Sequence, residues 1–280
     1  MPELPEVETI RRGLEDYLVG HAVEKVEILH PGVLFGDVNV ILGQKVINVR
    51  RVGKGLIIDF LNNYSLAIHV KLTGQLIYRG IKTHNMPISR HKVGTVPNKF
   101  THVIFDLDKD AKLYYNDQRR FGWIKILKTE DIMSLSFFKN MGPEPFKDLT
   151  IKVFEKILQN KTTKIKPLLM DQTKIGGIGN IYANDALFKA KINPERQAKS
   201  LSARNAAKLY RAIISVMEKS LKEGGASELS FVNALGQEGN YQEHTLVYGK
   251  VGKKCPVCEA YIKRITLAGR GTFFCEKCQK

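Results

Sequence analysis

The first residues of the chain carry the clearest potential for chemistry. Pro2 follows Met1, and removal of Met1 would give Pro2 a free secondary amine, with an ordinary pKa of about 7.7–8.0 and hence a neutral fraction near pH 7. Such an amine attacks a carbonyl-like carbon to form a cationic iminium, which on a deoxyribose C1′ would drive elimination of the 3′ phosphate. Glu3 follows directly as a candidate general acid and base. The alternative is a helix start with rigid prolines, in which Glu6 only complements the helix dipole.

All four cysteines lie in the last 26 residues, in two C-x2-C pairs separated by sixteen residues: Cys255, Cys258, Cys275 and Cys278. This spacing predicts one structural Zn2+ held by four thiolates. Two disulfides are the alternative, which a cytoplasmic location disfavours. Because residues 250–280 are too few to form much of a core, we expect metal binding to supply most of the folding free energy of this tail.

Two basic segments in the N-terminal half suit contacts with DNA. Lys54 stands between two glycines at a predicted strand start, where the backbone can approach a ligand closely. We interpret it as a phosphate contact, with a solvent-exposed turn lysine as the alternative. Arg119-Arg120-Phe121 lies between two predicted strands, and arginine beside an aromatic ring suits entry into a DNA base stack. The alternative is a basic turn with Phe121 in the core.

A glycine-rich segment precedes a predicted helix in the C-terminal half. Residues 171–184 run Asp-Gln-Thr-Lys-Ile-Gly-Gly-Ile-Gly-Asn-Ile-Tyr-Ala-Asn, and such a turn presents backbone amides to an anion. The spacing matches neither a P-loop nor a dinucleotide-binding motif. A DNA phosphate is therefore the favoured ligand, with a plain helix–helix connection as the alternative. We predict that Asn180 caps the helix that starts near Ile181.

The composition favours a polyanionic partner. The 280 residues include 44 Lys and Arg against 28 Asp and Glu, a formal net charge of +16. This excess favours nucleic acid over an anionic lipid surface or a basic protein without such a partner. The apolar runs are too short to span a bilayer and the first residues do not have the pattern of a signal peptide. We therefore expect a cytoplasmic protein that uses no membrane.

The hydrophobic pattern predicts the elements that position these residues. Residues 5–18 have apolar side chains at helical spacing, and short segments rich in Val, Ile and Tyr between residues 23 and 115 predict a β-sandwich. Residues 80–98 predict a mobile loop. After the rigid break at residues 142–145, the pattern predicts helices at 151–159, 164–170, 181–190 and 203–224, and a short one at 228–235. We predict a β-sandwich domain over residues 1–135, a linker over 136–145, a helical domain over 146–242 and a zinc finger over 243–280.

Together these motifs resemble those of formamidopyrimidine-DNA glycosylases, in the same order and over essentially the whole chain. The resemblance rests on Met-Pro-Glu-Leu-Pro-Glu-Val-Glu-Thr at residues 1–9, Arg-Arg-Phe-Gly at 119–122, Gly-Pro-Glu-Pro at 142–145, residues 176–183 and the four cysteines. It implies an α+β multidomain fold: an N-terminal helix with a β-sandwich, a helix–two-turns–helix domain and a C-terminal zinc hairpin, with DNA in the cleft between. It also implies excision of oxidised purines (8-oxoguanine and formamidopyrimidines) through a Schiff base on the N-terminal proline, followed by β,δ-elimination.

The resemblance also assigns roles to residues. It implies that Pro2 is the nucleophile, Glu3 the acid and base, and Lys54 the contact to the phosphate next to the lesion, while Glu6 supports the site. The DNA-binding residues that it implies are Leu72, His102, Arg119, Phe121, Lys161, Asn180 and Arg270. The implied partner is duplex DNA that contains oxidised bases. We expect a monomer with one structural Zn2+ and no small-molecule cofactor.

Three positions were compared with the usual pattern of the family. The family usually has methionine where Leu72 stands, and leucine is similar enough in volume to fill the hole that a flipped nucleotide leaves. Gln118 replaces the proline that usually precedes Arg-Arg-Phe, which leaves open what makes that loop rigid. Leu4 favours this branch over endonuclease VIII-type relatives, which usually have glycine there.

Two other functions stay open from the sequence. One is an endonuclease VIII-type glycosylase that acts on oxidised pyrimidines, and the other is a non-catalytic, zinc-dependent protein that only binds lesions. Pro2, Glu3 and Lys54 together argue against the second. Flipping a nucleotide out of the duplex costs a few kcal/mol, which basic residues offset by binding the backbone. Cytosine opposite the lesion presents two acceptors to Arg119 and adenine only one, so we expect a preference for lesions opposite cytosine.

Overall fold

The computed structural model describes residues 1–280, which form two compact units. One unit contains Met1–Lys139 and Leu221–Gln242, and the other contains Asn140–Ser220 and Glu243–Lys280. Leu221–Gln242 is thus grouped with the N-terminal residues, and the domain boundaries expected from the sequence stay a prediction. No helix is both long and apolar enough to cross a membrane.

The N-terminal helix α1 (Leu4–Leu18) begins where the sequence predicts it, because Glu3 caps its first turn. The Glu3 side chain accepts a hydrogen bond from the backbone of Glu6, and the Glu6 side chain accepts one from the backbone of Glu3. This reciprocal pair satisfies two backbone donors that a helix start leaves open. The apolar face of α1, including Val7, Ile10 and Leu14, is buried in the core of the N-terminal unit.

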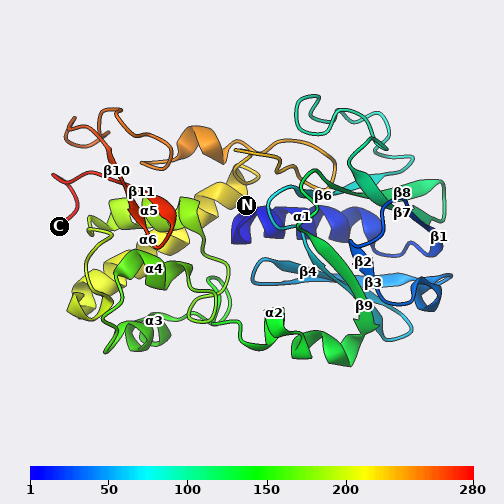
Figure 1. Ribbon diagram of the computed structural model, residues 1–280, viewed down its shortest axis with the longest axis horizontal. Coiled ribbons are helices and arrows are strands. Elements are labelled where there is room, and N and C mark those ends of the chain that lie inside the picture. The colour runs from blue at the N-terminus through cyan, green and yellow to red at the C-terminus, as the bar shows by residue number, and fades with distance from the viewer. The chain divides into compact units, whose positions relative to one another are not determined.

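The N-terminal unit is built on a β-sandwich, as predicted (Figure 1). One sheet has the order β1-β7-β8-β6 and the other has the order β2-β9-β5-β4-β3. The strands are β1 (Val23–Ile28), β2 (Leu34–Phe35), β3 (Val46–Val52), β4 (Gly55–Phe60), β5 (Tyr64–His69), β6 (Gly74–Arg79), β7 (Thr101–Leu107), β8 (Ala111–Asp117) and β9 (Trp123–Lys128). The short helix η1 (Val38–Ile41) lies between β2 and β3, and the short helices η2 (Thr129–Ser134) and α2 (Ser136–Lys139) follow β9.

The helix predicted at residues 228–235 is absent, and this prediction was wrong. The backbone there bonds to the sandwich instead of to itself. Tyr78 N donates to Ala234 O over 2.7 Å, and Gln75 Nε2 donates to Ser230 O over 2.7 Å. Phe231 and Ala234 also join the core that α1 and the two sheets share. Long-range pairing and burial thus outweigh the local helical preference of the segment.

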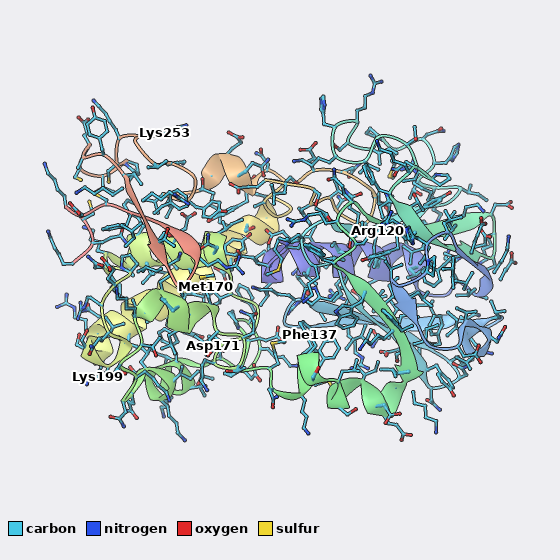
Figure 2. The ribbon with its side chains drawn as sticks, in the orientation of Figure 1. Arg120, Phe137, Met170, Asp171, Lys199 and Lys253 are labelled. Carbon is cyan, nitrogen blue, oxygen red and sulfur yellow. The ribbon has the colours of Figure 1, made fainter.

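A second apolar cluster packs on the five-stranded sheet next to Lys54. It includes Ile57 and Ala67 from the sheet and Phe138 from α2. Phe137, labelled in Figure 2, packs edge-on against His69 with ring centroids 4.6 Å apart. A Cβ at Gly55 would lie 2.7–2.8 Å from the rings of the two phenylalanines. Glycine beside Lys54 is therefore required by this packing.

The other unit contains helices and a β-hairpin. Its elements are α3 (Ile151–Leu158), α4 (Ile165–Met170), α5 (Asn180–Ala190), η3 (Ala198–Ser200), α6 (Ala203–Lys222), η4 (Tyr241–His244), β10 (Lys263–Leu267) and β11 (Arg270–Phe274), of which α6 and η4 extend across a unit boundary. Helix α5 is buried over almost its whole length. The four long helices and the hairpin agree with the sequence expectation.

Candidate functional site

The structure buries Pro2 and both neighbouring glutamates at the start of α1. Glu3 is 3% exposed and Glu6 is 1% exposed. One carboxylate oxygen of Glu6 accepts from Glu3 N over 2.8 Å, and the other accepts from Ala226 N over 2.8 Å. Glu6 therefore does more than complement a helix dipole. It connects the residue beside the predicted nucleophile to a segment 220 positions later in the chain.

Gly225 allows this connection to form. Its φ of +89° is in the left-handed region, and a Cβ there would lie 2.8 Å from the Phe231 ring and 3.1 Å from Glu6 Cγ. An L-residue would therefore be both strained and sterically excluded. The glycine at this position is explained by the close approach to Glu6.

The electrostatics of the amino terminus favour a neutral amine. Burial lowers the pKa of the Met1 amino group below its ordinary value of 8.0, and the charge of Lys54 lowers it further. Glu3, Glu6 and Glu228 oppose this shift. All four charged side chains thus act on the same point in space. Pro2, whose amine the removal of Met1 would expose, is itself buried.

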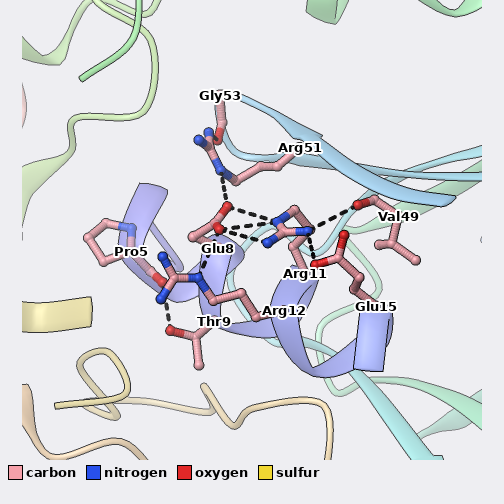
Figure 3. Close-up of polar contacts among 9 residues, drawn as sticks. All are labelled: Pro5, Glu8, Thr9, Arg11, Arg12, Glu15, Val49, Arg51 and Gly53. Carbon is pink, nitrogen blue, oxygen red and sulfur yellow. Dashed lines mark hydrogen bonds and ion pairs between the residues drawn. The ribbon is translucent and has the colours of Figure 1, made fainter. Parts of the chain in front are cut away.

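Lys54 is held at the end of the β3–β4 turn by a network around Glu8, which the sequence did not indicate (Figure 3). Arg51 donates through Nε to Glu8 over 3.1 Å and through Nη1 to Gly53 O over 2.8 Å. Arg11 bonds to Glu8 as well. Burial alone would raise the pKa of Glu8, but these arginines outweigh it and lower the pKa. These bonds attach the turn that carries Lys54 to α1. Lys54 is 4% exposed, so the alternative of a solvent-exposed turn lysine is excluded.

His69 is a further polar residue beside this group that the sequence alone did not single out. It is 4% exposed, and its Nδ1 accepts from Lys71 N over 2.9 Å. Burial, then the charges of Lys71 and Lys54, lower the pKa of His69 to about 3. The ring is therefore neutral at pH 7, and it buttresses the turn that leads to Leu72.

Predicted DNA-contacting residues of the N-terminal unit lie on two loops and one strand. Leu72 is half-buried, whereas Arg119 and Phe121 are exposed, with the guanidinium 4.6 Å from the ring centroid. Phe121 is 53% exposed, so its placement in the core is excluded. His102 on β7 is 1% exposed, and its Nε2 lies 2.7 Å from Asp117 O.

Lys161, Asn180 and Arg270 belong to the other unit, where Lys161 and Arg270 are exposed. Asn180 is the first residue of α5, and Gly179, in an extended conformation, occupies the cap position. The prediction that Asn180 caps this helix was wrong, because the bare glycine takes the non-helical conformation that the cap requires. Asn184 donates to Asn180 O over 2.6 Å.

Asn184 also bonds to the hairpin that carries Arg270. Its Oδ1 accepts from Phe273 N over 2.8 Å. The buried Lys166 of α4 donates to Gly271 O over 2.9 Å and to Thr272 Oγ1 over 2.7 Å. Two side chains from the helices thus fix the position of β11. Neither was singled out from the sequence, because single buried polar residues leave no pattern.

The four cysteines meet the geometric requirements of a zinc site. Their sulfur atoms all lie within 4.8 Å of one another. Cys255 and Cys278 are 3.8 Å apart at Sγ, and Cys258 and Cys275 are 3.4 Å apart. A tetrahedral ion with Zn–S bonds of about 2.3 Å places its sulfurs roughly 3.8 Å apart. A disulfide needs about 2.05 Å, so the disulfide alternative is excluded and one structural Zn2+ fits.

Comparison with known proteins decides the family. Residues 1–124 match the formamidopyrimidine-DNA glycosylase N-terminal domain, residues 141–231 match the H2TH domain of the same enzymes, and residues 252–280 match the zinc finger found in FPG and IleRS. The chain belongs to the formamidopyrimidine-DNA glycosylase family. The formamidopyrimidine-DNA glycosylase of Pelotomaculum thermopropionicum is 40% identical over 286 residues, which cover 100% of this chain and 99% of that protein. The Rickettsia africae enzyme is 38% identical over 100% of this chain and 99% of its own.

Solved structures of the family share the whole fold. Lactococcus lactis Fpg in complex with DNA that contains a benzyl-Fapy-dG has a TM-score of 0.87 and 35% identity, with 100% of both chains covered. The same enzyme with DNA that contains an abasic site has a TM-score of 0.85 and 34% identity, with 99% of both chains covered. The α+β arrangement of sandwich, H2TH helices and zinc hairpin is thereby confirmed.

Proposed function

We propose that this chain is a bifunctional DNA glycosylase and abasic-site lyase of base-excision repair that removes oxidised purines from duplex DNA. Its full-length relatives bear the name formamidopyrimidine-DNA glycosylase, and Lactococcus lactis Fpg binds DNA that contains Fapy-dG or an abasic site. The observation that carries the proposal is the burial of Pro2 beside Glu3, with Lys54 acting on the same amino terminus.

The chemistry follows from the environment of that amine. Once Met1 is removed, Pro2 N is a secondary amine that burial and Lys54 favour in its neutral, nucleophilic form. Attack on C1′ forms an N–C bond as the glycosidic bond breaks, and Glu3 supplies the proton that the leaving base requires. The amine then loses its proton, the C1′–O4′ bond breaks with a proton going to O4′, and the nitrogen lone pair forms a cationic iminium. Loss of a C2′ proton places an electron pair on the iminium, and that pair in turn expels the 3′ phosphate, which leaves with the electrons of the C3′–O bond. Glu6 positions Glu3 through the backbone bond.

The remaining predicted residues bind and hold the DNA. Lys54 of one unit and Lys161, Asn180 and Arg270 of the other are proposed phosphate contacts. Leu72, Arg119 and Phe121 are proposed to fill the gap left by the flipped nucleotide. His102 is buried, with Nε2 2.7 Å from Asp117 O, and its role in DNA binding stays a prediction. Zn2+ stabilises the hairpin that carries Arg270 and takes no part in bond breaking. We propose that the protein acts as a monomer, without a small-molecule cofactor, on chromosomal DNA in the cytoplasm of a bacterium, as its bacterial relatives suggest.

Borohydride trapping tests nucleophile and substrate together. A duplex with 8-oxoguanine opposite cytosine is incubated with enzyme and borohydride, and the covalent adduct is mapped by mass spectrometry. We expect an adduct on Pro2, and none with chains that retain Met1, whose Pro2 N is a tertiary amide. A matched duplex with an oxidised pyrimidine separates the endonuclease VIII-type alternative; the comparison is needed because Lactococcus lactis Fpg has also been solved with such DNA. If no adduct forms with an abasic duplex either, the remaining function is that of a non-catalytic protein that only binds lesions.

Glu3→Gln separates chemistry from binding. The amide retains the shape of the side chain but removes its titrating proton, so we expect excision of 8-oxoguanine to fall by about 10²-fold or more while lesion DNA still binds. Attack on a ready-made abasic site should partly survive, because the base has already left. Near wild-type excision would remove Glu3 from the mechanism, and an equal loss of DNA binding would make it a structural residue.

A further inference from the structure

Two loops carry the side chains proposed to fill the gap in the DNA. Leu72 lies on the β5–β6 loop, and Arg119 and Phe121 lie on the β8–β9 loop. Each loop contains a non-glycine residue in the left-handed region, Lys71 with φ +47° and Arg120 with φ +55°. Such conformations cost free energy and persist only where the surroundings impose them. Because the second loop has Gln118 in place of proline, another residue must supply its rigidity.

The Asp117 carboxylate supplies a shared attachment for both loops. It is 0% exposed, and its Oδ1 accepts a hydrogen bond from the hydroxyl of Thr73, the residue after Leu72. The same oxygen accepts from Arg119 N over 3.2 Å. Arg119 N in turn lies 3.0 Å from Thr73 Oγ1. Three polar groups thus form a closed set of contacts: Thr73 on the β5–β6 loop, Asp117 at the end of β8 and Arg119 on the β8–β9 loop.

The second carboxylate oxygen holds the far end of the β8–β9 loop. Asp117 Oδ2 accepts from Gly122 N over 2.8 Å and from Tyr115 OH over 3.4 Å. Burial and the Asp117 charge raise the pKa of Tyr115 above its ordinary value, so its hydroxyl stays a donor. A Cβ at Gly122 would lie 2.1 Å from Tyr115 OH and 2.8 Å from His69 O. The loop is therefore pinned at both ends of the Arg119–Phe121 segment.

The backbone of Asp117 also engages a third predicted DNA contact. Its carbonyl oxygen lies 2.7 Å from Nε2 of the buried His102. An unpaired buried carboxylate is costly, but here each oxygen has two donors, which offset the loss of hydration. Loss of any one of these donors would leave the buried carboxylate partly unpaired and destabilise the folded protein. The positions of the groups therefore depend on one another.

From this geometry we infer that Asp117 is a positioning residue that holds the Leu72 loop and the Arg119–Phe121 loop in one fixed relation, so that both enter the DNA gap as a unit. The inference rests on the proposed function. A preorganised pair of loops avoids an ordering cost when DNA binds, and small misplacements of such a pair reduce catalysis strongly. Asp117 touches no reacting atom, so its loss acts through the loops.

The hydroxyl of Thr73 offers the mildest test. Thr73→Val keeps the shape but removes the bond to Asp117, Thr73→Ser keeps the hydroxyl, and Asp117→Asn places an amide N–H against donors. Thr83→Val is the matched control, because Thr83 is also buried and its hydroxyl bonds only to Gly80. Each variant is mixed with a duplex that holds an unreactive tetrahydrofuran site, with 2-aminopurine next to the base opposite, so that insertion of the loops raises fluorescence.

We expect the fluorescence rise to be lost or slowed by about tenfold or more in Thr73→Val and Asp117→Asn, and to be close to wild type in Thr73→Ser and Thr83→Val. Excision of 8-oxoguanine from the duplex should fall in parallel, with a loss of preference for cytosine opposite. If Thr73→Val or Asp117→Asn folds normally and gives a wild-type rate and amplitude, or if Thr73→Ser behaves as Thr73→Val does, the inference is overturned.

Cleavage of a single-stranded abasic oligonucleotide separates positioning from damage to the fold. A single strand has no gap to fill, so the Thr73 variants should cleave it at the wild-type rate while losing activity on duplex. Equal losses on both substrates would indicate a merely structural role and contradict the inference. A failure of the proposed function gives a different result from a failure of this inference. In that case the wild-type protein itself would form no borohydride adduct with any abasic DNA.

Discussion

The pKa of the amine at the start of the chain depends on the residues around it. An exposed proline amine would be mostly protonated at neutral pH. In the chain that still has Met1, burial and Lys54 lower the pKa of the Met1 amino group, while three glutamates oppose the shift. Lys54 therefore has two functions in our proposal, as a phosphate contact and as an electrostatic activator of the nucleophile.

Lys54→Gln separates these two functions. The rate of adduct formation on abasic DNA should rise with pH as the amine loses its proton, and removal of the nearby positive charge should move that rise to higher pH. Excess enzyme in single-turnover mode removes the effect of weaker binding. Lys25→Gln, at an exposed lysine of β1, is the control and should leave the profile in place. A Lys54→Gln profile that coincides with wild type would contradict the activating role.

His69 gives a separate pH signature, in stability rather than in rate. Its pKa is about 3 in the folded protein against 6.5 ordinarily, so the unfolded chain binds the extra proton as the pH falls below 6.5. The stabilisation that His69 provides above that pH is thus lost progressively down to pH 3, by about 2 kcal/mol at pH 5. His69→Asn keeps an acceptor for Lys71 N. Between pH 7 and pH 5, the free energy of unfolding measured with denaturant should fall by about 2 kcal/mol less in this variant than in the wild type. If the free energy of unfolding falls equally in the wild type and in His69→Asn, the lowered pKa of His69 is refuted.

At the scale of elements, the sequence was sufficient where a pattern repeats. Short segments rich in Val, Ile and Tyr and the helical spacing of apolar residues in α1 placed these elements within a few residues, and C-x2-C spacing located the zinc site. The helix expected at residues 228–235 failed because its backbone is used by β6 and by the core around Phe231. Asp117, Glu8 and Asn184 were missed for a related reason: one buried polar residue has no periodicity, and its partners lie far away in sequence.

The β10–β11 hairpin depends on its metal more than on its core. The apolar cluster at the hairpin is small, and it includes all four residues of the zinc site, Cys255, Cys258, Cys275 and Cys278. We expect Cys275→Ser or chelation to unfold the hairpin, free Arg270, weaken DNA binding and lower its salt dependence by about one unit for that contact. The single tryptophan, Trp123, lies in β9, so its fluorescence should show the sandwich still folded. Normal DNA affinity in zinc-free protein would rule this out.

At the scale of the whole molecule, the proposed roles divide between the two units. The N-terminal unit contains every residue proposed to act on the sugar or enter the base stack, whereas the other contains the zinc site and further phosphate contacts. Substitutions in the second unit should therefore change affinity and salt dependence, while substitutions in the first change reaction rates and selectivity for the lesion.

The bond between Glu6 and Ala226 also has a consequence for how the protein is made. The N-terminal unit is discontinuous, and its last part, Leu221–Gln242, leaves the ribosome 103 residues after Lys139. At about 5–20 residues per second, the sandwich waits roughly 5–20 s for the segment that completes its core and holds Glu6. A nascent or prematurely terminated chain thus has the nucleophile but lacks the contact that orders its surroundings. Strand-cleaving activity would appear only after Leu221–Gln242 has been translated.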